Sequence, residues 1–502
     1  MKTAYRQSIL LATLITTMVA VHAGSESGPL VKTSQGTYQG VKEGAHLVFK
    51  GLPYAQAPVG DLRWRAPLEP ESHTGVRKAT TLPNACPQNR ASQTMSEDCL
   101  YLNVWSAGLE EPDRPVMVWI HGGGFRAGSG DVDGHVFANK GAVVVSINYR
   151  LGPLGFFSHP ELSTGEANFG LLDMVAALKW VQSNIAAFGG DANNVTIFGV
   201  SAGGMAVNML MASPHSKGLF HRAIAQSGYA TWPLPHSRNA QGPVPTDWQN
   251  RAMPSAEAVS AQLISSITDG EPSLAALRKV EAQTLVGALK SFQLPIVDGH
   301  TLTAEPAVVF SQGNQRDVPY LTGGNSHEGT VFGGVGMSLD DVQAAFTETK
   351  STVTKLYASD FLRSADTAWK RLFGDQRYLL SAFETSNAVA SQGKPTWLYL
   401  VDFIPAAYRD QWLGTPHGMD AFFLWGGEKS DDPEVRALAQ RMTQYWFNFA
   451  RTGTPNGAGM IWPAYNAKDA HWLVFSNTDT VRQHMLADKL ALLSKKYRQR
   501  FR

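Results

Sequence analysis

Continuous apolar runs alternate with a helical pattern along the first half of the chain. Three runs rich in β-branched residues, at 116–120, 142–147 and 195–198, predict strands that are buried on both faces. Between the second and third runs, the Leu, Ala and Val spacing of residues 171–181 predicts a helix packed on a sheet. This strand–helix–strand order predicts an α/β fold with a mostly parallel sheet flanked by helices.

The rest of the pattern predicts one large domain with long insertions. Residues 235–302 carry helical and polar patches without strand signals, and we expect them to form a helical insertion over one end of the sheet. A late strand is predicted at 398–403, followed by a loop and a helix. No linker, charge block or internal repeat divides the chain, so we expect a single domain over residues 24–502.

Residues 1–23 have the pattern of a signal peptide. Lys2 and Arg6 precede an apolar run at 9–21, and small residues suited to signal peptidase follow. The run is shorter than the roughly 20 apolar residues that a membrane-spanning helix needs. We therefore expect an exported protein, secreted or periplasmic, without a membrane span.

Composition narrows the function further. The chain has 502 residues with a formal net charge of +1, which shows no bias toward nucleic acids or other polyanions. Cys86 and Cys99 are the only cysteines, and in an exported chain they are expected to pair, although two unlinked thiols remain the alternative. Their disulfide would stabilise the fold by about 3 kcal/mol. No His-Glu-x-x-His or paired-Cys spacing occurs, so no metal or other cofactor is predicted.

A nucleophile motif follows the strand predicted at 195–198. Gly199-Val200-Ser201-Ala202-Gly203 stands between this strand and a helical run at 205–211. A nucleophile elbow needs small residues two positions before and after its serine, because the tight turn brings backbones close together. The strand–turn–helix setting predicts an α/β-hydrolase fold with Ser201 as the nucleophile.

Three consecutive glycines follow the strand that ends at Ile120. In His121-Gly122-Gly123-Gly124-Phe125 no side chain covers the backbone N–H groups. The N–H groups of Gly123, Gly124 and Ala202 are predicted to form an oxyanion hole. A phosphate-binding turn is the alternative, but no Lys-Ser/Thr pair follows the glycines.

With these motifs the chain resembles the type-B carboxylesterases, the group that includes cholinesterases and bacterial para-nitrobenzyl esterases. The resemblance covers nearly the whole mature chain. It rests on two long matches to the family's sequence patterns, one around Ser201 at 188–203 and one at 97–104. Four shorter segments also match, at 51–55, 148–152, 226–228 and 451–456. It implies a serine hydrolase that cleaves small-molecule carboxylic esters through an acyl-enzyme on Ser201.

The catalytic base and acid follow from chain order and from the resemblance. In α/β-hydrolases the order is Ser, then Asp or Glu, then His, which leaves His417 and His471 as the best placed bases. His417 lies in a turn-rich loop that looks like the family's histidine loop. The family's Asn-x-x-Glu-Gly turn implies Glu328 as the acid. Asp298 is the rival, although its Asp-Gly pair is more typical of a turn.

The resemblance also implies supporting contacts. Arg150 should pair with Asp173, and Arg63 should pair with Glu97, as structural ion pairs. Ser227, in the segment Gln-Ser-Gly, is expected to form a hydrogen bond near the acid of the triad.

Two apolar residues depart from the family pattern. Val200 and Met174 stand where many relatives carry glutamate and glutamine. We expect the two to form an apolar contact in place of a buried polar one. The missing negative charge beside His417 disfavours cationic, choline-type substrates.

Substrate specificity is the least determined feature. Aromatic residues near the motifs are candidates for lining an apolar acyl or alcohol pocket, with ordinary core packing as the alternative; they are Trp105, Phe125, Phe332, Phe422, Phe423 and Trp425. Arg126, beside the glycines, would suit a carboxylate on a polycarboxylate ester, although a solvated surface arginine is the simpler interpretation. The competing functions are a non-catalytic, cholinesterase-like binding module and a lipase acting at oil interfaces.

Overall fold

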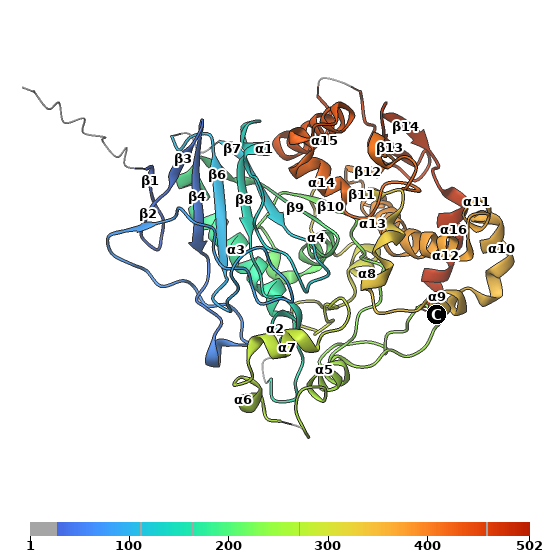
Figure 1. Cartoon of the computed structure of the whole chain (residues 1–502), viewed down its shortest axis with the longest axis horizontal. Helices are drawn as coiled ribbons and strands as arrows, with labels where there is room; N and C mark the ends of the chain where they lie inside the picture. Colours follow the sequence, from blue (N-terminus) through green and yellow to red (C-terminus); the bar gives the residue numbers. More distant parts are fainter. Residues whose placement is uncertain (1–27, 111–112, 163–164, 271, 458–459, 502) are drawn as a thin grey trace, which may run out of the picture.

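A large mixed sheet with helices on both faces forms the centre of the molecule (Figure 1). The computed structural model describes residues 28–110, 113–162, 165–270, 272–457 and 460–501, so the expected signal peptide at 1–23 lies outside the described residues. Within them, eleven strands form the large sheet: β3 (Val41–Glu43), β4 (His46–Pro53), β6 (Tyr101–Ser106), β7 (Arg114–Ile120), β8 (Val143–Ile147), β9 (Gly190–Val200), β10 (Arg222–Gln226), β11 (Tyr320–Asn325), β12 (Thr396–Val401), β13 (His471–Phe475) and β14 (Thr480–Gln483). A small second sheet contains β1 (Leu30–Lys32), β2 (Thr37–Gln39) and β5 (Val76–Lys78).

The helices follow the strands along the chain. In order, the α-helices are α1 (His135–Ala138), α2 (Gly152–Gly155), α3 (Phe169–Asn184), α4 (Ala202–Ala212), α5 (Ala256–Ile264), α6 (Leu274–Leu277), α7 (Ala282–Ala288), α8 (Pro306–Ser311), α9 (Leu339–Ala345), α10 (Lys350–Leu356), α11 (Ala358–Phe361), α12 (Ala365–Gly374), α13 (Leu380–Ser391), α14 (Met419–Trp425), α15 (Pro433–Thr452) and α16 (Ala487–Gln499). Two irregular turns matter below, the 3-10 segment η4 (Glu328–Gly334) and the π-helical turn η6 (Asp375–Leu379). No helix within the described residues is long and apolar enough to cross a membrane.

The centre of the sheet is parallel and its edges are antiparallel. The strand order is β14-β13-β12-β11-β10-β9-β7-β8-β6-β4-β3, and every neighbouring pair from β8 to β13 runs parallel. The pairs that involve β3, β4, β6 and β14 are antiparallel. The expectation of a mostly parallel sheet therefore holds for its core, and the complete sheet is mixed.

The apolar runs are continuous because both faces of the sheet are covered. In β7, Val116, Val118 and Ile120 belong to the core cluster that contains the apolar side chains of α3 and α4. Met117 and Trp119 alternate with them and belong to the cluster formed with α14 and α15. Burying each large apolar side chain contributes roughly 1.5 to 3 kcal/mol, so neither face can be left to solvent.

The predicted insertion is helical. Helices α5, α6 and α7 lie together at the lower edge of the molecule in Figure 1, below the sheet and close to α2. The strands and helices expected at 116–120, 142–147, 171–181, 195–198 and 205–211 all form, with ends shifted by a few residues.

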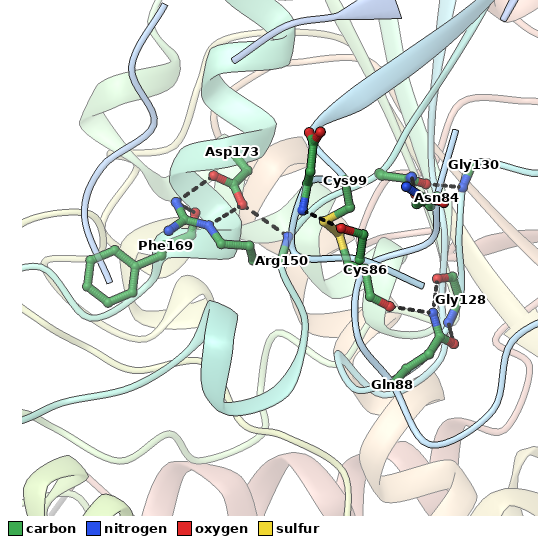
Figure 2. The surroundings of a disulfide bond; sticks show 12 residues. Asn84, Cys86, Gln88, Cys99, Gly128, Gly130, Arg150, Phe169 and Asp173 are labelled. Carbon is green, nitrogen blue, oxygen red and sulfur yellow. Dashed lines mark hydrogen bonds and ion pairs between the residues drawn. A yellow bond between two sulfur atoms is a disulfide. The ribbon is translucent and has the colours of Figure 1, made fainter. Parts of the chain in front are cut away.

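The two cysteines form a disulfide. Cys86 and Cys99 are joined by an S–S bond of 2.02 Å, and both are buried. Figure 2 shows that Gln88, inside the bridged segment, faces the backbone of Gly128. The disulfide-bridged segment therefore touches the loop that follows β7.

Candidate active site

Ser201 occupies the tight turn between β9 and α4. Its backbone has φ +57° and ψ −117°, a strained conformation for a residue with a side chain. A Cβ atom on Gly199 or Gly203 would stand 2.5 or 2.1 Å from the carbonyl oxygen of Ile120. Only glycine permits the approach of β7 at these two positions, which explains the small residues of the motif.

The imidazole of His417 lies between Ser201 and Glu328. Its Nε2 atom is 2.8 Å from Ser201 Oγ, and its Nδ1–H donates to a carboxylate oxygen of Glu328. His417 is held in the loop between β12 and α14, where its backbone N–H donates to Thr330 Oγ1 at 3.0 Å. The ring of Tyr378 covers the imidazole, with 4.5 Å between ring centroids. A hydroxyl, an imidazole and a carboxylate are thus connected in series.

Glu328 is buried among hydrogen-bond donors. Its Oε1 atom accepts from Ser227 Oγ at 2.6 Å, from the Asn325 N–H at 2.7 Å and from Asn325 Nδ2 at 3.3 Å. A buried carboxylate is tolerated where donors surround it. The role expected for Ser227, a hydrogen bond near the acid, is present in the structure.

A second buried acid that sequence reasoning missed lies behind Glu328. Asp420 accepts from Tyr399 Oη at 2.6 Å, Asn325 Nδ2 at 3.1 Å and Gln226 Nε2 at 3.2 Å. Burial, with a smaller contribution from the charge of Glu328, raises the pKa of Asp420. The signal in the sequence was its position three residues after His417, at the start of α14.

The glycine segment after β7 exposes backbone donors beside Ser201. We call residues 121–130 the oxyanion loop. Gly123 and Gly124 have φ values of +110° and +64°, which favour glycine. Within the described residues, the N–H groups of Gly123, Gly124 and Ala202 donate to no protein acceptor. All three remain available to a ligand.

The oxyanion loop begins with a buried, neutral histidine. His121 is buried and stacks on Tyr149, with 4.3 Å between ring centroids. Its Nδ1 atom lies 2.8 Å from the carbonyl oxygen of Gly122. Burial lowers the pKa of His121 to about 4, so the imidazole is uncharged at neutral pH.

The rival candidates lie elsewhere. Asp298 is fully buried, but its carboxylate accepts from Asn168 Nδ2 and Thr301 Oγ1 and from backbone N–H groups of its own turn, so it fixes that turn. His471 begins β13 at the antiparallel edge of the sheet and faces Gln483. Neither residue contacts His417.

The expected ion pairs are present, whereas one expected contact is wrong. Arg150 Nη2 lies 2.7 Å from Asp173, and Arg63 and Glu97 also pair (Figure 2 shows the first). Val200 and Met174, however, belong to different core clusters. Side chains alternate along β9, so residue 200 points away from the face that α3 covers, and no apolar contact between the two can form.

The predicted pocket residues separate into two groups. Trp105, Phe423 and Trp425 pack in the core on the α14 and α15 side of the sheet, and Phe422 is 52% exposed. Phe125 is buried at the end of the glycine run, against Phe156. Phe332 lies in η4 and packs on Phe373, with 5.0 Å between ring centroids. Phe125 directly follows Gly124, and Phe332 lies on the same turn as Glu328.

Arg126 is part of the oxyanion loop and is partly buried. Its guanidinium stands 4.9 Å from the ring centroid of Phe292. The Phe292 ring in turn packs on Gly124, and it lines an apolar cavity of about 450 Å³ that extends toward α2 and α5. Within the described residues, no group of three His, Cys, Asp or Glu side chains is arranged to hold a metal ion.

Fold and site together define a hydrolase of the α/β-hydrolase fold. The profile of the carboxylesterase family matches residues 27–493. Fumonisin B1 esterase of Sphingopyxis macrogoltabida is 34% identical over 90% of this chain and 87% of its own length. Para-nitrobenzyl esterase of Bacillus subtilis is 32% identical over 92% of this chain and 97% of its own.

Solved structures agree with these relatives. A structure titled PNB esterase superimposes with a TM-score of 0.80 at 31% identity, over 92% of this chain and 99% of that one. The chain belongs to the carboxylesterase family, and it is a carboxylic ester hydrolase that acts on small-molecule esters. This confirms the family, the fold and the enzyme class predicted from the sequence.

Proposed function

We propose that Ser201, His417 and Glu328 form the catalytic triad of this esterase. The observation that carries the proposal is the 2.8 Å separation of Ser201 Oγ and His417 Nε2, with Glu328 bound to the opposite ring nitrogen. Ser201 Oγ attacks the ester carbonyl carbon while His417 takes its proton. Glu328 holds the imidazole in the required tautomer and stabilises the imidazolium that forms.

The oxyanion loop completes the mechanism. The carbonyl oxygen becomes negatively charged as Ser201 adds, and the free N–H groups of Gly123, Gly124 and Ala202 donate to it. His417 then returns its proton to the departing alcohol. In the second half of the cycle, His417 activates a water that hydrolyses the acyl-enzyme and regenerates Ser201. Because the base must be neutral, kcat/KM is expected to fall in acidic solution.

The environment of the nucleophile suits esters without a cationic alcohol. Val200, beside Ser201, belongs to an apolar cluster, so no carboxylate stands there to attract a quaternary ammonium group. This favours general carboxylic esters of the kind named for the para-nitrobenzyl relative over choline esters.

We also propose export through the signal peptide at 1–23. The disulfide of Cys86 and Cys99 supports an oxidising destination, since such bonds persist outside the cytosol. Cell fractionation with mass spectrometry of the mature chain tests this, and the expected mature N-terminus is Gly24. Recovery of the intact chain from the cytosol with reduced cysteines contradicts it.

Active-site labelling and two variants test the triad. A fluorophosphonate should label the wild type on Ser201, and Ser201→Ala should lose both the label and turnover by several orders of magnitude. Glu328→Gln keeps the shape but loses the carboxylate, and kcat is expected to fall roughly 10³ to 10⁴-fold. Ser494→Ala is the matched control, because this buried hydroxyl on α16 has no partner within the described residues.

The outcomes separate the candidate functions. Label and activity that persist in Ser201→Ala refute the assigned nucleophile. A wild type that hydrolyses no ester and takes no label supports the non-catalytic binding module. Activity that rises sharply only above the concentration at which the substrate forms micelles supports the lipase.

A further inference from the structure

One buried arginine lacks an acidic partner. Within the described residues four arginines are buried, and three of them pair with an acid, as Arg63–Glu97, Arg150–Asp173 and Arg500–Glu305. Arg377 is the exception. It is 2% exposed, no carboxylate of the described residues lies within 4.0 Å of it, and its Nε atom has no hydrogen-bond partner there.

Aromatic rings surround the Arg377 guanidinium. Its Cζ atom lies 4.2 Å from the ring centroid of Tyr229, 4.3 Å from that of Trp232 and 5.8 Å from that of Tyr378. The attraction of aromatic faces for a cation offsets only part of the cost of burying an unpaired charge. Stacking on rings also leaves the edge of the planar guanidinium, which carries the N–H groups, free to bind an anion.

Two tyrosine hydroxyls beside this arginine also lack acceptors. Tyr229 Oη and Tyr378 Oη are buried beside the Arg377 guanidinium, and neither hydroxyl donates to an acceptor within the described residues. The two rings are 5.9 Å apart. Burial raises the pKa of Tyr229 to about 12, so its hydroxyl stays protonated at neutral pH and can donate. Hydrogen-bond donors without an acceptor are therefore gathered in neighbouring side chains of the interior.

This cluster adjoins the active site. Arg377 lies in η6, and the next residue, Tyr378, places its ring 4.5 Å from that of His417. Tyr229 follows β10 two residues after Ser227, whose hydroxyl donates to Glu328. Arg377 thus directly precedes a residue that packs on His417, and one of the rings against its guanidinium, Tyr229, is two residues from Ser227.

We infer that Arg377 binds a carboxylate group carried by the substrate ester, so that the enzyme prefers esters with a second, ionised carboxyl group. This inference rests on the catalytic centre proposed above. The guanidinium matches a carboxylate with two parallel N–H···O bonds, and such pairs are strong where water is excluded. A substrate carboxylate supplies the negative charge that the chain itself does not place beside Arg377.

The inference differs from the expectation for Arg126. Arg126 is more exposed than Arg377, so water competes more strongly there for a carboxylate. The Arg377 guanidinium is enclosed, so its interaction with a carboxylate is screened less and discriminates more strongly against neutral esters.

The test compares matched esters on the complete wild-type enzyme. One arm uses para-nitrophenyl hemiglutarate against para-nitrophenyl valerate, which differ mainly in the acyl carboxylate. The other arm carries the carboxylate on the alcohol. We expect kcat/KM for the carboxylate ester to exceed that of its neutral partner at least tenfold in one arm. Arg377→Gln should lower this ratio at least tenfold.

Two variants control for structural effects. Arg500→Gln removes another buried arginine that lies between 5 and 6 Å from aromatic rings, but one that pairs with Glu305, and it should lower stability without changing the ratio. Arg377→Lys keeps the charge without the planar fork, and it should restore part of the preference. If Arg377→Gln fails to fold, inhibition of the wild-type enzyme tests the inference instead. Glutarate should compete with substrate at least tenfold better than valeramide.

The outcomes separate this inference from the proposed function. Hydrolysis of neutral esters without a carboxylate preference in either arm overturns the role of Arg377 and leaves the triad intact. A preference that Arg126→Gln abolishes and Arg377→Gln preserves also overturns it. If no ester is hydrolysed, the triad proposal fails, whereas glutarate binding to Ser201→Ala, measured by calorimetry, still tests Arg377.

Discussion

Replacing Gln88 by alanine removes the clamp between the disulfide-bridged segment and the oxyanion loop. The Gln88 amide accepts from the Gly128 N–H and donates to the Gly128 carbonyl, both at 2.9 Å, and it also donates to the Cys86 carbonyl at 3.1 Å (Figure 2). Gly128 follows Gly124, one of the proposed oxyanion donors, by four residues. The substitution therefore frees the loop without touching the nucleophile or the triad.

The size of the effect follows from the groups left unpaired. Two partly buried backbone groups of Gly128 lose their partner, and at about 1 kcal/mol each, the lower end for such groups, the loss of stability is about 2 kcal/mol. Complete loss of one oxyanion donor raises the barrier by roughly 2.7 to 4 kcal/mol, which sets the upper limit on activity. We expect kcat to fall about tenfold to 100-fold. KM should change little, because the oxyanion exists only in the transition state.

Steady-state kinetics with a small neutral ester and urea unfolding measure the two effects. Gln182→Ala is the matched control: this glutamine donates to two backbone carbonyls, of Ala192 and Leu219, at 2.9 and 3.1 Å, and contacts no part of the oxyanion loop. Both variants should lose stability, but only Gln88→Ala should lose kcat. A Gln88→Ala enzyme with reduced stability and the kcat of the wild type refutes the clamp.

Two further predictions concern stability. The Cys86→Ser, Cys99→Ser double variant should lose about 3 kcal/mol of unfolding free energy, as should the reduced wild type; urea midpoints unchanged by reductant contradict this. His121, with its pKa lowered to about 4, binds fewer protons folded than unfolded between that pH and about 6.5, so stability should fall as pH drops through this range, by about 3 kcal/mol. His121→Asn should flatten urea-unfolding free energies between pH 7 and 4 relative to His471→Asn; parallel curves argue against it.

Local signals made the elbow and the sheet core predictable. Gly199 and Gly203 are required because of a backbone contact with Ile120, and the apolar run before them ends where that contact begins. Chain order left His417 and His471 as bases, and the family resemblance then favoured His417 and implied Glu328. The structure places His417 against Ser201 and Glu328 against His417. The nucleophile motif, the buried strand before it and the order of Ser, acid and His along the chain all concern the same small site. Each signal therefore strengthens the others.

No comparable sequence signal identified the residues that line the site. Phe422 and Phe423 are neighbours on α14, yet one is 52% exposed and the other fully buried, because one turn of helix presents them to different sides. Trp105 resembles any other aromatic residue near a motif until the cover of its sheet face by α14 and α15 is known. Which aromatic ring faces a substrate depends on helices placed far away in the sequence.

Whether a charged residue such as Arg377 has a partner also depends on segments that are distant in the sequence. In the sequence Arg377 follows Gln376 in a segment of ordinary helical composition, whereas Arg126 stands beside three glycines and attracts attention. Whether an arginine is paired is a property of the folded chain, since an acid such as Glu305 reaches Arg500 from a distant segment. Only when every other buried arginine has been matched to its acid does the unmatched one become visible. Its position behind Tyr378 then makes the substrate the best candidate for the missing charge.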